Sequence, residues 1–357
     1  QLMSAGAVLR TAFCGPCFGA GDVPANNSLS IRHSTRNFPN REGSKPGEGK
    51  ISSVALMDAR SIAATAVNGG FLTPATELDY VKPDLTYHFD GSIYKNRVYN
   101  GFGRPQKDRE LRFGPNIADW PKMIPLQEHL ILKIASVITD PVTTTDELIP
   151  SGETSSYRSN PLKLAEFTLA RKDPQYVARA KAVRALELER QQLVAGEKDP
   201  ADISAGLEAL GEHVIAEAKL SMTLEELFKN SGIGSTIYAL KPGDGSAREQ
   251  AASCQKVLGG WANIAKEYAT KRYRSNLINW GMLPFTFAGN PDIFTVDSIV
   301  FIPNLRQKLI AKEQKIPALV INSGGTKQIE LMLPALTDDE TEIILKGSLI
   351  NYYSVAK

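Results

Sequence analysis

Two cysteines, Cys14 and Cys17, stand two residues apart near the start of the chain. Thiolates at this spacing chelate one metal centre or close a redox disulfide. A thioredoxin-like disulfide requires a helix directly after the pair, whereas residues 18–22 (FGAGD) indicate a loop. Zinc needs two further ligands, and the four histidines of the chain are scattered singly. An iron–sulfur cluster is the third possibility, for which the pair alone supplies too few cysteines.

The third cysteine of the chain, Cys254, lies in the apolar helical segment Ala251-Ala252-Ser253-Cys254. A thiol in such a segment is typically a buried packing residue, so we do not expect it to be a ligand. Three cysteines are also too few for the disulfide framework of a secreted protein, and they suit a reducing compartment.

A glycine-rich loop, residues 241–250 (KPGDGSAREQ), separates a predicted strand at 235–240 from a predicted helix that runs through Cys254. A loop of this kind directs backbone N–H groups and a helix N-terminus at an anion, which could be a carboxylate or a phosphate. The glycine spacing matches neither nucleotide-binding motif, and no acidic residue stands where a ribose would need it. We therefore do not expect a nucleotide at this loop.

The elements that position these residues follow from the hydrophobic pattern, which indicates an α/β protein. Helical periodicity covers residues 57–68 and stops at Gly69-Gly70, and an apolar run at 130–138 predicts a buried strand ending near Thr143-Thr144-Thr145-Asp146. Residues 319–322 predict a further strand, with Gly324-Gly325 as its turn. Between about 74 and 125 the chain is rich in Pro, Tyr and Asp, which is typical of a linker.

A helical hairpin is predicted from Asp173-Pro174 and again from Asp199-Pro200, with each aspartate as N-cap and each proline as the first helical residue. The charge-rich stretch 179–192 within it is expected to be a solvated helix face.

The composition narrows the class of protein. With 357 residues, 42% of them hydrophobic, the chain can form two or three domains. Its 41 basic and 39 acidic residues are dispersed, which argues against nucleic acid and anionic membranes as partners. The sequence shows neither an apolar run of about 18 residues nor a secretory signal, so we expect a cytoplasmic location, or the mitochondrial matrix in a eukaryote. The opening Gln1-Leu2-Met3 suggests a fragment or a processed product.

Several short blocks, taken together and in order, resemble the aconitase family of iron–sulfur hydro-lyases. The resemblance extends from Cys14 to Phe285 and is weaker in the linker and the helical hairpin. The blocks are Cys14-Gly15-Pro16-Cys17-Phe18-Gly19, Ser34-Thr35-Arg36-Asn37-Phe38-Pro39-Asn40-Arg41, Thr144-Thr145-Asp146, Arg158, residues 243–249, Leu258-Gly259-Gly260 and residues 279–285.

The resemblance implies an aconitase-like α/β third domain followed by a swivelling β/β/α domain with an inserted helical hairpin. On this basis residues 1–75 form part of the cluster-binding body, 76–125 a linker, and 126–357 the swivel domain, with the insertion at about 161–230. The two body domains that normally come first are missing from this sequence. We therefore expect an upstream aconitase-like half, from the same precursor or as a separate chain.

The resemblance also implies roles for individual residues. Cys14 and Cys17 would hold a [4Fe-4S] cluster whose third cysteine comes from the missing upstream part. Ser246 would be the catalytic base, and Asp146 would orient groups or accept protons near it, unless it is a plain helix N-cap. Arginine forks suit carboxylates, and the residues that would bind the substrate are Arg36, Arg41, Arg158 and Arg248.

The predicted function is that of a hydro-lyase that dehydrates and rehydrates a small hydroxy di- or tricarboxylic acid. Ala247 stands where the family usually has a second serine, Glu147 where it has histidine, and Thr35 where asparagine often precedes the arginine. These departures favour the uncharacterised hydratase branch of the family. One alternative is an apo binding or regulatory module for RNA or a protein, and another is a natural split enzyme.

Two expectations concern the surroundings of this site. The resemblance places Arg274 and Ser275 at the mouth of the cleft. The aromatic and apolar residues nearby are expected to belong to the core, as such residues usually do. They are Trp261, Trp280, Leu283 and Phe285.

Overall fold

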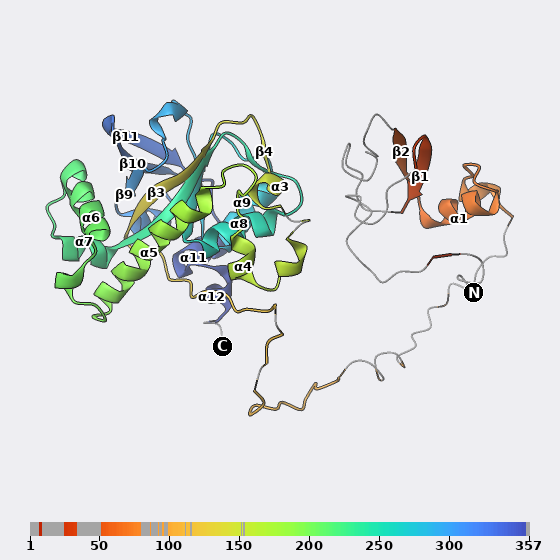
Figure 1. The fold of residues 1–357 in the computed structure, drawn as a ribbon, viewed down its shortest axis with the longest axis horizontal. Helices are drawn as coiled ribbons and strands as arrows, with labels where there is room; N and C mark the ends of the chain where they lie inside the picture. The colour runs from red at the N-terminus through yellow and green to blue at the C-terminus, as the bar shows by residue number, and fades with distance from the viewer. Residues whose placement is uncertain are drawn as a thin grey trace. The chain divides into compact units, whose positions relative to one another are not determined.

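The computed structural model describes residues 7–8, 25–33, 51–79, 86, 92, 95, 99–110, 112–114, 116–150, 152 and 154–354. The chain divides into two compact units, Gln1–Lys107 and Asp108–Lys357, which are drawn in Figure 1. The division falls inside the predicted linker, and the described residues from 99 to 128 form neither helix nor strand. Among the helices that the structure describes, none is long and apolar enough to span a membrane.

The first unit contains the parallel strand pair β1 (Ser28–Arg32) and β2 (Ser52–Leu56), followed by helix α1 (Ala59–Val67). Asp58 caps the helix, because its side chain accepts hydrogen bonds from the backbone N–H groups of Arg60 and Ser61 at 3.0 and 3.2 Å. The predicted helix at 57–68 is thereby confirmed.

The second unit is built on a barrel of strands. Among the described residues, seven strands close it in the order β10-β11-β8-β7-β5-β3-β9, and β3, β5, β7 and β8 are parallel neighbours. The α/β class and the predicted strands are confirmed. The strands of the barrel are β3 (His129–Ile138), β5 (Ser231–Ala239), β7 (Gly260–Ala265), β8 (Leu283–Thr286), β9 (Ile299–Ile302), β10 (Lys315–Asn322) and β11 (Gly325–Met332).

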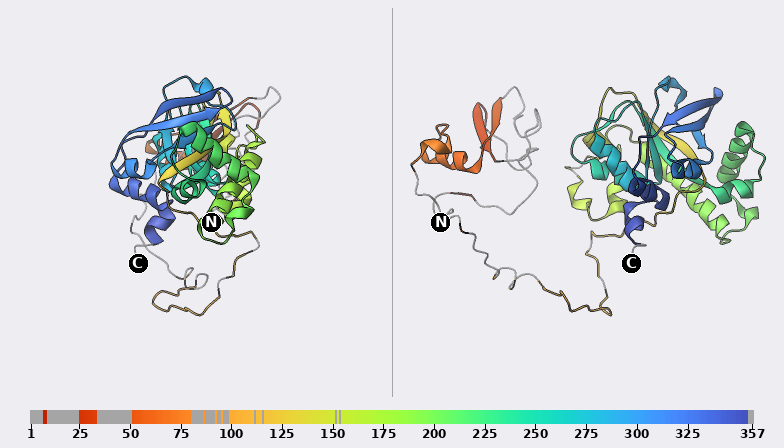
Figure 2. Two further views of the ribbon diagram at one scale, coloured as in Figure 1. Left: turned by 90° about the vertical axis from the view of Figure 1, so that its left-hand side faces the viewer. Right: turned by 180° about the vertical axis from the view of Figure 1, so that it is seen from behind.

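Helices cover the outside of this barrel (Figures 1 and 2). A short parallel ladder, β4 (Thr143–Thr144) with β6 (Pro242–Asp244), stands apart from it. The helices are α3 (Thr145–Leu148), α4 (Pro161–Ala165), α5 (Tyr176–Val194), α6 (Ala205–Ala218), α7 (Leu224–Asn230), α8 (Arg248–Val257), α9 (Lys271–Asn279), α10 (Leu305–Ile310), α11 (Asp338–Lys346) and α12 (Leu349–Ser354).

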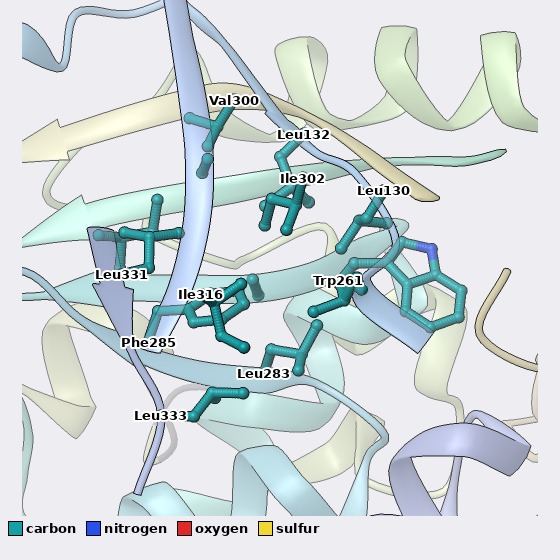
Figure 3. Packing of buried hydrophobic residues seen from close by; sticks show 14 of the residues in the cluster. Leu130, Leu132, Trp261, Leu283, Phe285, Val300, Ile302, Ile316, Leu331 and Leu333 are labelled. Carbon is teal, nitrogen blue, oxygen red and sulfur yellow. The ribbon is translucent and has the colours of Figure 1, made fainter. Parts of the chain in front are cut away.

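Side chains alternate between the two faces of each strand, as the two-residue period requires. Leu130 and Leu132 of β3 point into the barrel, where they pack with residues of β9 such as Val300 (Figure 3). Between them, Ile131 faces outward and belongs to the cluster under α5, α6 and α7. Burying one such side chain stabilises the fold by roughly 1.5–3 kcal/mol. The predicted core residues Trp261, Trp280, Leu283 and Phe285 are all buried.

The predicted start of the helical hairpin is wrong in detail. Gln175, not Asp173, is the N-cap of α5, and the Asp173 carboxylate instead accepts from the Gln175 backbone N–H at 3.2 Å and pairs with Arg179. Asp199 caps only a short 3₁₀ turn, and Ser204 caps the helix α6 that follows. The Asp-Pro signals therefore mark turns that lead into the helices rather than the helix starts.

The predicted solvated face of α5 is wrong at two positions. Glu187 and Arg190 are 6% and 2% exposed, and their side chains form an ion pair at 2.7 Å. Glu187 also accepts a hydrogen bond from the backbone N–H of Ile233 in β5, at 2.8 Å. Two charges can be buried when they pair and when their other polar atoms are hydrogen-bonded. The charge pattern along one helix does not reveal such a pairing.

Candidate functional site

The glycine-rich loop connects β5, β6 and the start of α8, and its backbone needs glycine. Gly245 has a φ of +126°, and a Cβ there would overlap the hydroxyl of Thr145 at the start of α3. Gly243 has a φ of +96°, and a Cβ there would overlap the ring of Tyr273 in α9. L side chains rarely adopt these conformations. The two glycines therefore allow the loop to lie directly against α3 and α9.

The start of α3 is held by a reciprocal cap. The Glu147 backbone N–H donates to Thr144 Oγ1 at 3.2 Å, and the Thr144 backbone N–H donates to Glu147 Oε2 at 2.7 Å. Thr144 is therefore the N-cap, and the alternative that Asp146 serves as a plain cap is wrong. Asp146 instead forms an ion pair with Arg171, with Oδ2 and Nη1 2.8 Å apart.

Ser246 lies exposed at the end of the loop, two residues before Arg248 begins α8. The N-cap of α8 is Ala247, which makes no side-chain hydrogen bond to the first turn. The backbone N–H groups of that turn carry the partial positive charge of the helix N-terminus. The Ser246 hydroxyl thus stands beside a helix end that favours negative charge.

The N-terminus of α9 lies next to that of α8. Each helix follows a strand of the parallel set β5, β7 and β8, so both begin at the carboxyl edge of these strands. Thr270 caps α9 by accepting from the Tyr273 backbone N–H at 3.2 Å, and its hydroxyl donates to the Gly243 carbonyl at 3.2 Å. The first turns of α8 and α9 therefore lie at the same edge of the barrel.

A cavity of about 320 Å³ opens between the first turns of the two helices. Its lining contains three cationic side chains and a single carboxyl group, so an anion with more than one negative charge fits its electrostatics. The cavity is lined by Ser246, Arg248, Glu249, Lys271, Arg272, Ser275 and Asn276.

Glu249 is the acidic member of this cavity. Burial raises the pKa of its carboxyl group, although hydrogen bonds with the side chains of Ser253 and Trp280 act in the opposite direction. An incoming anion therefore meets one carboxyl group as well as the three cations in this cavity.

The floor of the site is held by a buried polar network. The Tyr273 hydroxyl oxygen accepts from Gln255 Nε2 at 2.9 Å and from Asn263 Nδ2 at 2.8 Å. Burial raises the pKa of Tyr273 far above its usual value, so the phenol stays neutral. Because Tyr273 supports the loop at Gly243, this network fixes the position of the loop relative to α8 and α9.

The structure brings together some of the predicted site residues. Ser246, Arg248 and Ser275 line the same cavity. Asp146 and Arg158 are not among its lining residues, and Arg158 is exposed in the turn before α4. The predicted residues Cys14, Cys17, Arg36 and Arg41 lie outside the described residues.

Sequence reasoning missed Glu249, Lys271, Arg272 and Asn276 as cavity residues. Glu249 directly follows Arg248, and the adjacent basic pair Lys271-Arg272 at the start of a helix is the signal that could have indicated a second source of positive charge.

The described part of the chain contains no group of three His, Cys, Asp or Glu side chains that could hold a metal ion. Within it, Cys254 is 1% exposed, and burial raises the pKa of its thiol to about 12. The prediction that Cys254 is a buried packing residue is confirmed. Of the three cysteines in the sequence, Cys14 and Cys17 therefore remain as candidate cluster ligands.

Two family models match this chain. Residues 1–64 match the aconitase family (aconitate hydratase), and residues 216–290 match the aconitase C-terminal domain. The second segment includes the glycine-rich loop, α8 and α9, which supply the residues that line the cavity.

Curated relatives match different extents of the chain. It is 24% identical over 376 residues to a putative mitochondrial aconitate hydratase of Emericella nidulans, covering 98% of this chain and 43% of that protein. It is 30% identical over 122 residues to the mitochondrial homocitrate dehydratase of Saccharomyces cerevisiae, covering 31% and 14%. The chain thus spans less than half the length of these relatives.

Among solved structures, 3-isopropylmalate dehydratase (leuD) from Methanocaldococcus jannaschii is 23% identical. The match covers 64% of this chain and 95% of that one, with a TM-score of 0.37. This likeness is too weak to bear on the argument.

Proposed function

The chain belongs to the aconitase family, and from this premise we propose that it is the C-terminal portion of a hydro-lyase for a small hydroxy di- or tricarboxylic acid. The observation that carries the proposal is that Ser246 and Arg248 open into one cavity together with Lys271 and Arg272. A hydroxyl group that can act as a base and several cations are what proton removal beside a carboxylate requires.

In this proposal Ser246 takes a proton from the carbon next to a substrate carboxylate. The negative charge that the serine oxygen carries before this step is stabilised by the N-terminus of α8 and by the surrounding cations. Arg248 binds a carboxylate through two parallel hydrogen bonds, as guanidinium groups do. Arg36, Arg41 and Arg158 are proposed to bind the remaining carboxylates, and Asp146 to orient groups near the base.

Cys14 and Cys17 are proposed to supply two ligands of a [4Fe-4S] cluster, with the third from an upstream aconitase-like half. Thiolates are the ligands that iron–sulfur clusters use, so the donor set of this pair fits the group. When bound, an iron atom without a cysteine ligand would supply Lewis-acid activation of the substrate hydroxyl.

The proposal is tested by anaerobic iron–sulfur reconstitution of this chain alone and mixed with an upstream aconitase-like half. Visible absorption and EPR detect the cluster, and conversion of hydroxy di- and tricarboxylic acids is then assayed in the mixture. We expect a cluster and activity in the mixture, and loss of both with Cys14→Ser or Cys17→Ser.

Cys254→Ala is the matched control, because this thiol of α8 is buried in a hydrophobic cluster and is not proposed as a ligand. If the mixture forms no cluster, or if Cys14→Ser leaves it intact, the proposed role of this pair is wrong. If a cluster forms but no hydroxy acid is converted, the proposed reaction is wrong.

A further inference from the structure

A second cavity, of about 470 Å³, adjoins the first one. Glu249 and Asn276 belong to the lining of both, so the two cavities meet at these side chains and form one groove, which lies between α8 and α9 in its first part and between α9 and α12 in its second. Its first part is cationic, whereas its second part is mainly apolar and aromatic. The second part is lined by Glu249, Asn276, Asn279, Trp280, Leu349, Ile350 and Tyr353.

The apolar end of the groove is completed by α12, which is held by a close backbone contact and by the side chain of Asn351. Gly281, just after α9, and Gly347, just before α12, touch so closely that a Cβ on Gly281 would overlap the Gly347 backbone. The Asn351 side chain donates to the carbonyls of Met123 and Lys346, at 2.9 and 2.7 Å. The backbone contact at Gly347 and the Asn351 side chain thus both hold α12 in place.

Two apolar side chains of α12 are left open to solvent. Ile350 is 48% exposed and Tyr353 is 65% exposed, and both line the groove. Side chains three apart on a helix share one face. This apolar helix face contributes little to the core and lies next to a cationic cavity. The two together suit a ligand that has an anionic part and an apolar part.

Glu249 stands in the wall between the two parts. Its carboxyl group hydrogen-bonds the side chains of Ser253 and Trp280, which are residues of α8 and of the end of α9. These bonds hold the carboxyl group within the wall. A ligand that reaches from the cationic part to the apolar part passes beside a carboxyl group that is already engaged.

We propose that the groove between α8, α9 and α12 binds a carboxylic acid that carries an apolar arm. The carboxylates lie at Arg248, Lys271 and Arg272, and the arm lies against Trp280, Ile350 and Tyr353. This inference rests on the proposed function, because it takes the cationic part of the groove as the carboxylate site. It adds Ile350 and Tyr353 as the residues that determine which arm is accepted.

The test is a titration of the whole chain with succinate and with 2-alkylsuccinates that carry methyl, butyl and octyl arms. Tryptophan fluorescence is the readout, because the Trp280 ring lines the groove and lies 4.4 Å from the ring of Trp120. We expect the affinity to rise about fourfold for each added methylene until the apolar part is filled.

Variants separate the two parts of the groove. Ile350→Ala should remove most of the gain from the longer arms and leave the affinity for succinate unchanged. Arg272→Gln should weaken every member of the series. Ile310→Ala is the matched control, since Ile310 is also an exposed isoleucine but lies on α10.

Three results would overturn the inference. If succinate and octylsuccinate bind equally well, the apolar part takes no arm, while carboxylate binding under the proposed function still stands. If octylamine binds as well as octylsuccinate, the apolar part acts without the cations. If neither acid binds, the groove is not a carboxylate site, and the activity assay of the reconstituted mixture then decides the hydro-lyase proposal separately.

Discussion

The two ends of α8 carry basic side chains in opposite surroundings. Arg248, at the N-terminus, lines an open cavity. Lys256, at the C-terminal turn, is buried, and its Nζ has no hydrogen-bond partner and lies 3.6 Å from the centre of the Trp261 ring. Desolvation lowers the pKa of Lys256 to about 7, although Glu187 acts in the opposite direction. A positive charge on one helix is therefore available to a ligand at one end and costly to the fold at the other.

Near the buried end of α8, Glu187 of α5 shows how the fold accommodates a charge away from water. Glu187 accepts hydrogen bonds from Arg190 Nε and Nη2, from Gln191 and from the Ile233 backbone, all between 2.7 and 2.8 Å. The charge of Lys256 has only a ring face and a distant carboxylate. Charges with hydrogen-bond partners can be buried, whereas a buried amine without them gives up its proton more readily.

The largest effect is expected at the N-terminus of α8, beside the open cavity. Ser246→Ala in the reconstituted mixture should lower the hydro-lyase rate by about 10²–10⁴-fold, because the base is lost. Steady-state rates with the best hydroxy acid measure it. Ser323→Ala, in the exposed turn between β10 and β11, is the control. A fall of less than about tenfold would mean that Ser246 is not the base.

Glu187→Gln tests the buried charges near the C-terminal end of α8. This variant keeps the shape of the side chain and removes its charge. Arg190 then stays buried without a counter-charge, and we expect a loss of about 3–5 kcal/mol in the free energy of unfolding. Urea unfolding followed by circular dichroism measures this. Glu313→Gln, which alters the partly exposed pair with Lys308, should change stability by less than about 1 kcal/mol. Equal effects of the two variants would contradict the contrast.

Lys256→Met tests the cost of the buried amine directly, because it replaces a charge that lacks a hydrogen-bond partner by an apolar side chain of similar length. Lys256 has a lower pKa in the folded state, about 7, than its ordinary value of 10.5. Below pH 7 the buried amine is protonated and the full cost is present, and this cost disappears as the pH rises from 7 to 10.5.

The variant should therefore be more stable than the parent by a few kcal/mol at pH 6, and the difference should shrink steadily toward pH 10. Urea unfolding of both proteins across this range measures the difference. A stabilisation that is the same at both pH values, or a loss of stability at pH 6, would show that the amine is not desolvated.

The smallest expected effect concerns the loop at the open end. Gly245→Ala should cost about 1–3 kcal/mol, because the position combines a positive φ with contact to Thr145. Gly196→Ala is the matched control: its φ is +71°, but nothing lies within 4 Å of the added Cβ, so strain alone of about 1 kcal/mol is expected. Thermal unfolding measures both. A smaller cost at Gly245 than at Gly196 would mean that Thr145 does not constrain the loop.

The fold could be predicted from the sequence where the signal is local. The apolar run at 130–138 indicates β3, and the order strand, glycine loop, helix places Ser246 and Arg248 at a helix N-terminus. The closure of the barrel could not be predicted in this way, because the pattern within a strand does not say which strand lies beside it. The pairing of β3 with β9, for example, joins residues about 170 positions apart.

The buried charges were missed for a related reason. Glu187 lies in a charge-rich helix, and its burial depends on Arg190 and on a backbone N–H group 46 residues away. Lys256 follows a polar residue near a helix end, and its amine lies against the ring of Trp261, from the next strand. Such environments arise when distant segments pack together, so the sequence of one helix does not contain them.

The contact between Gly281 and Gly347 helps to hold α12, whereas other residues of this helix are proposed to determine which ligand the groove accepts. The Gly281–Gly347 contact and the Asn351 side chain hold α12, while the exposed side chains at 350 and 353 line the groove. Substitutions at exposed positions usually change stability by less than about 0.5 kcal/mol. Descendants of this chain can therefore exchange residues 350 and 353 almost freely, and preference for a new ligand can evolve here without endangering the fold.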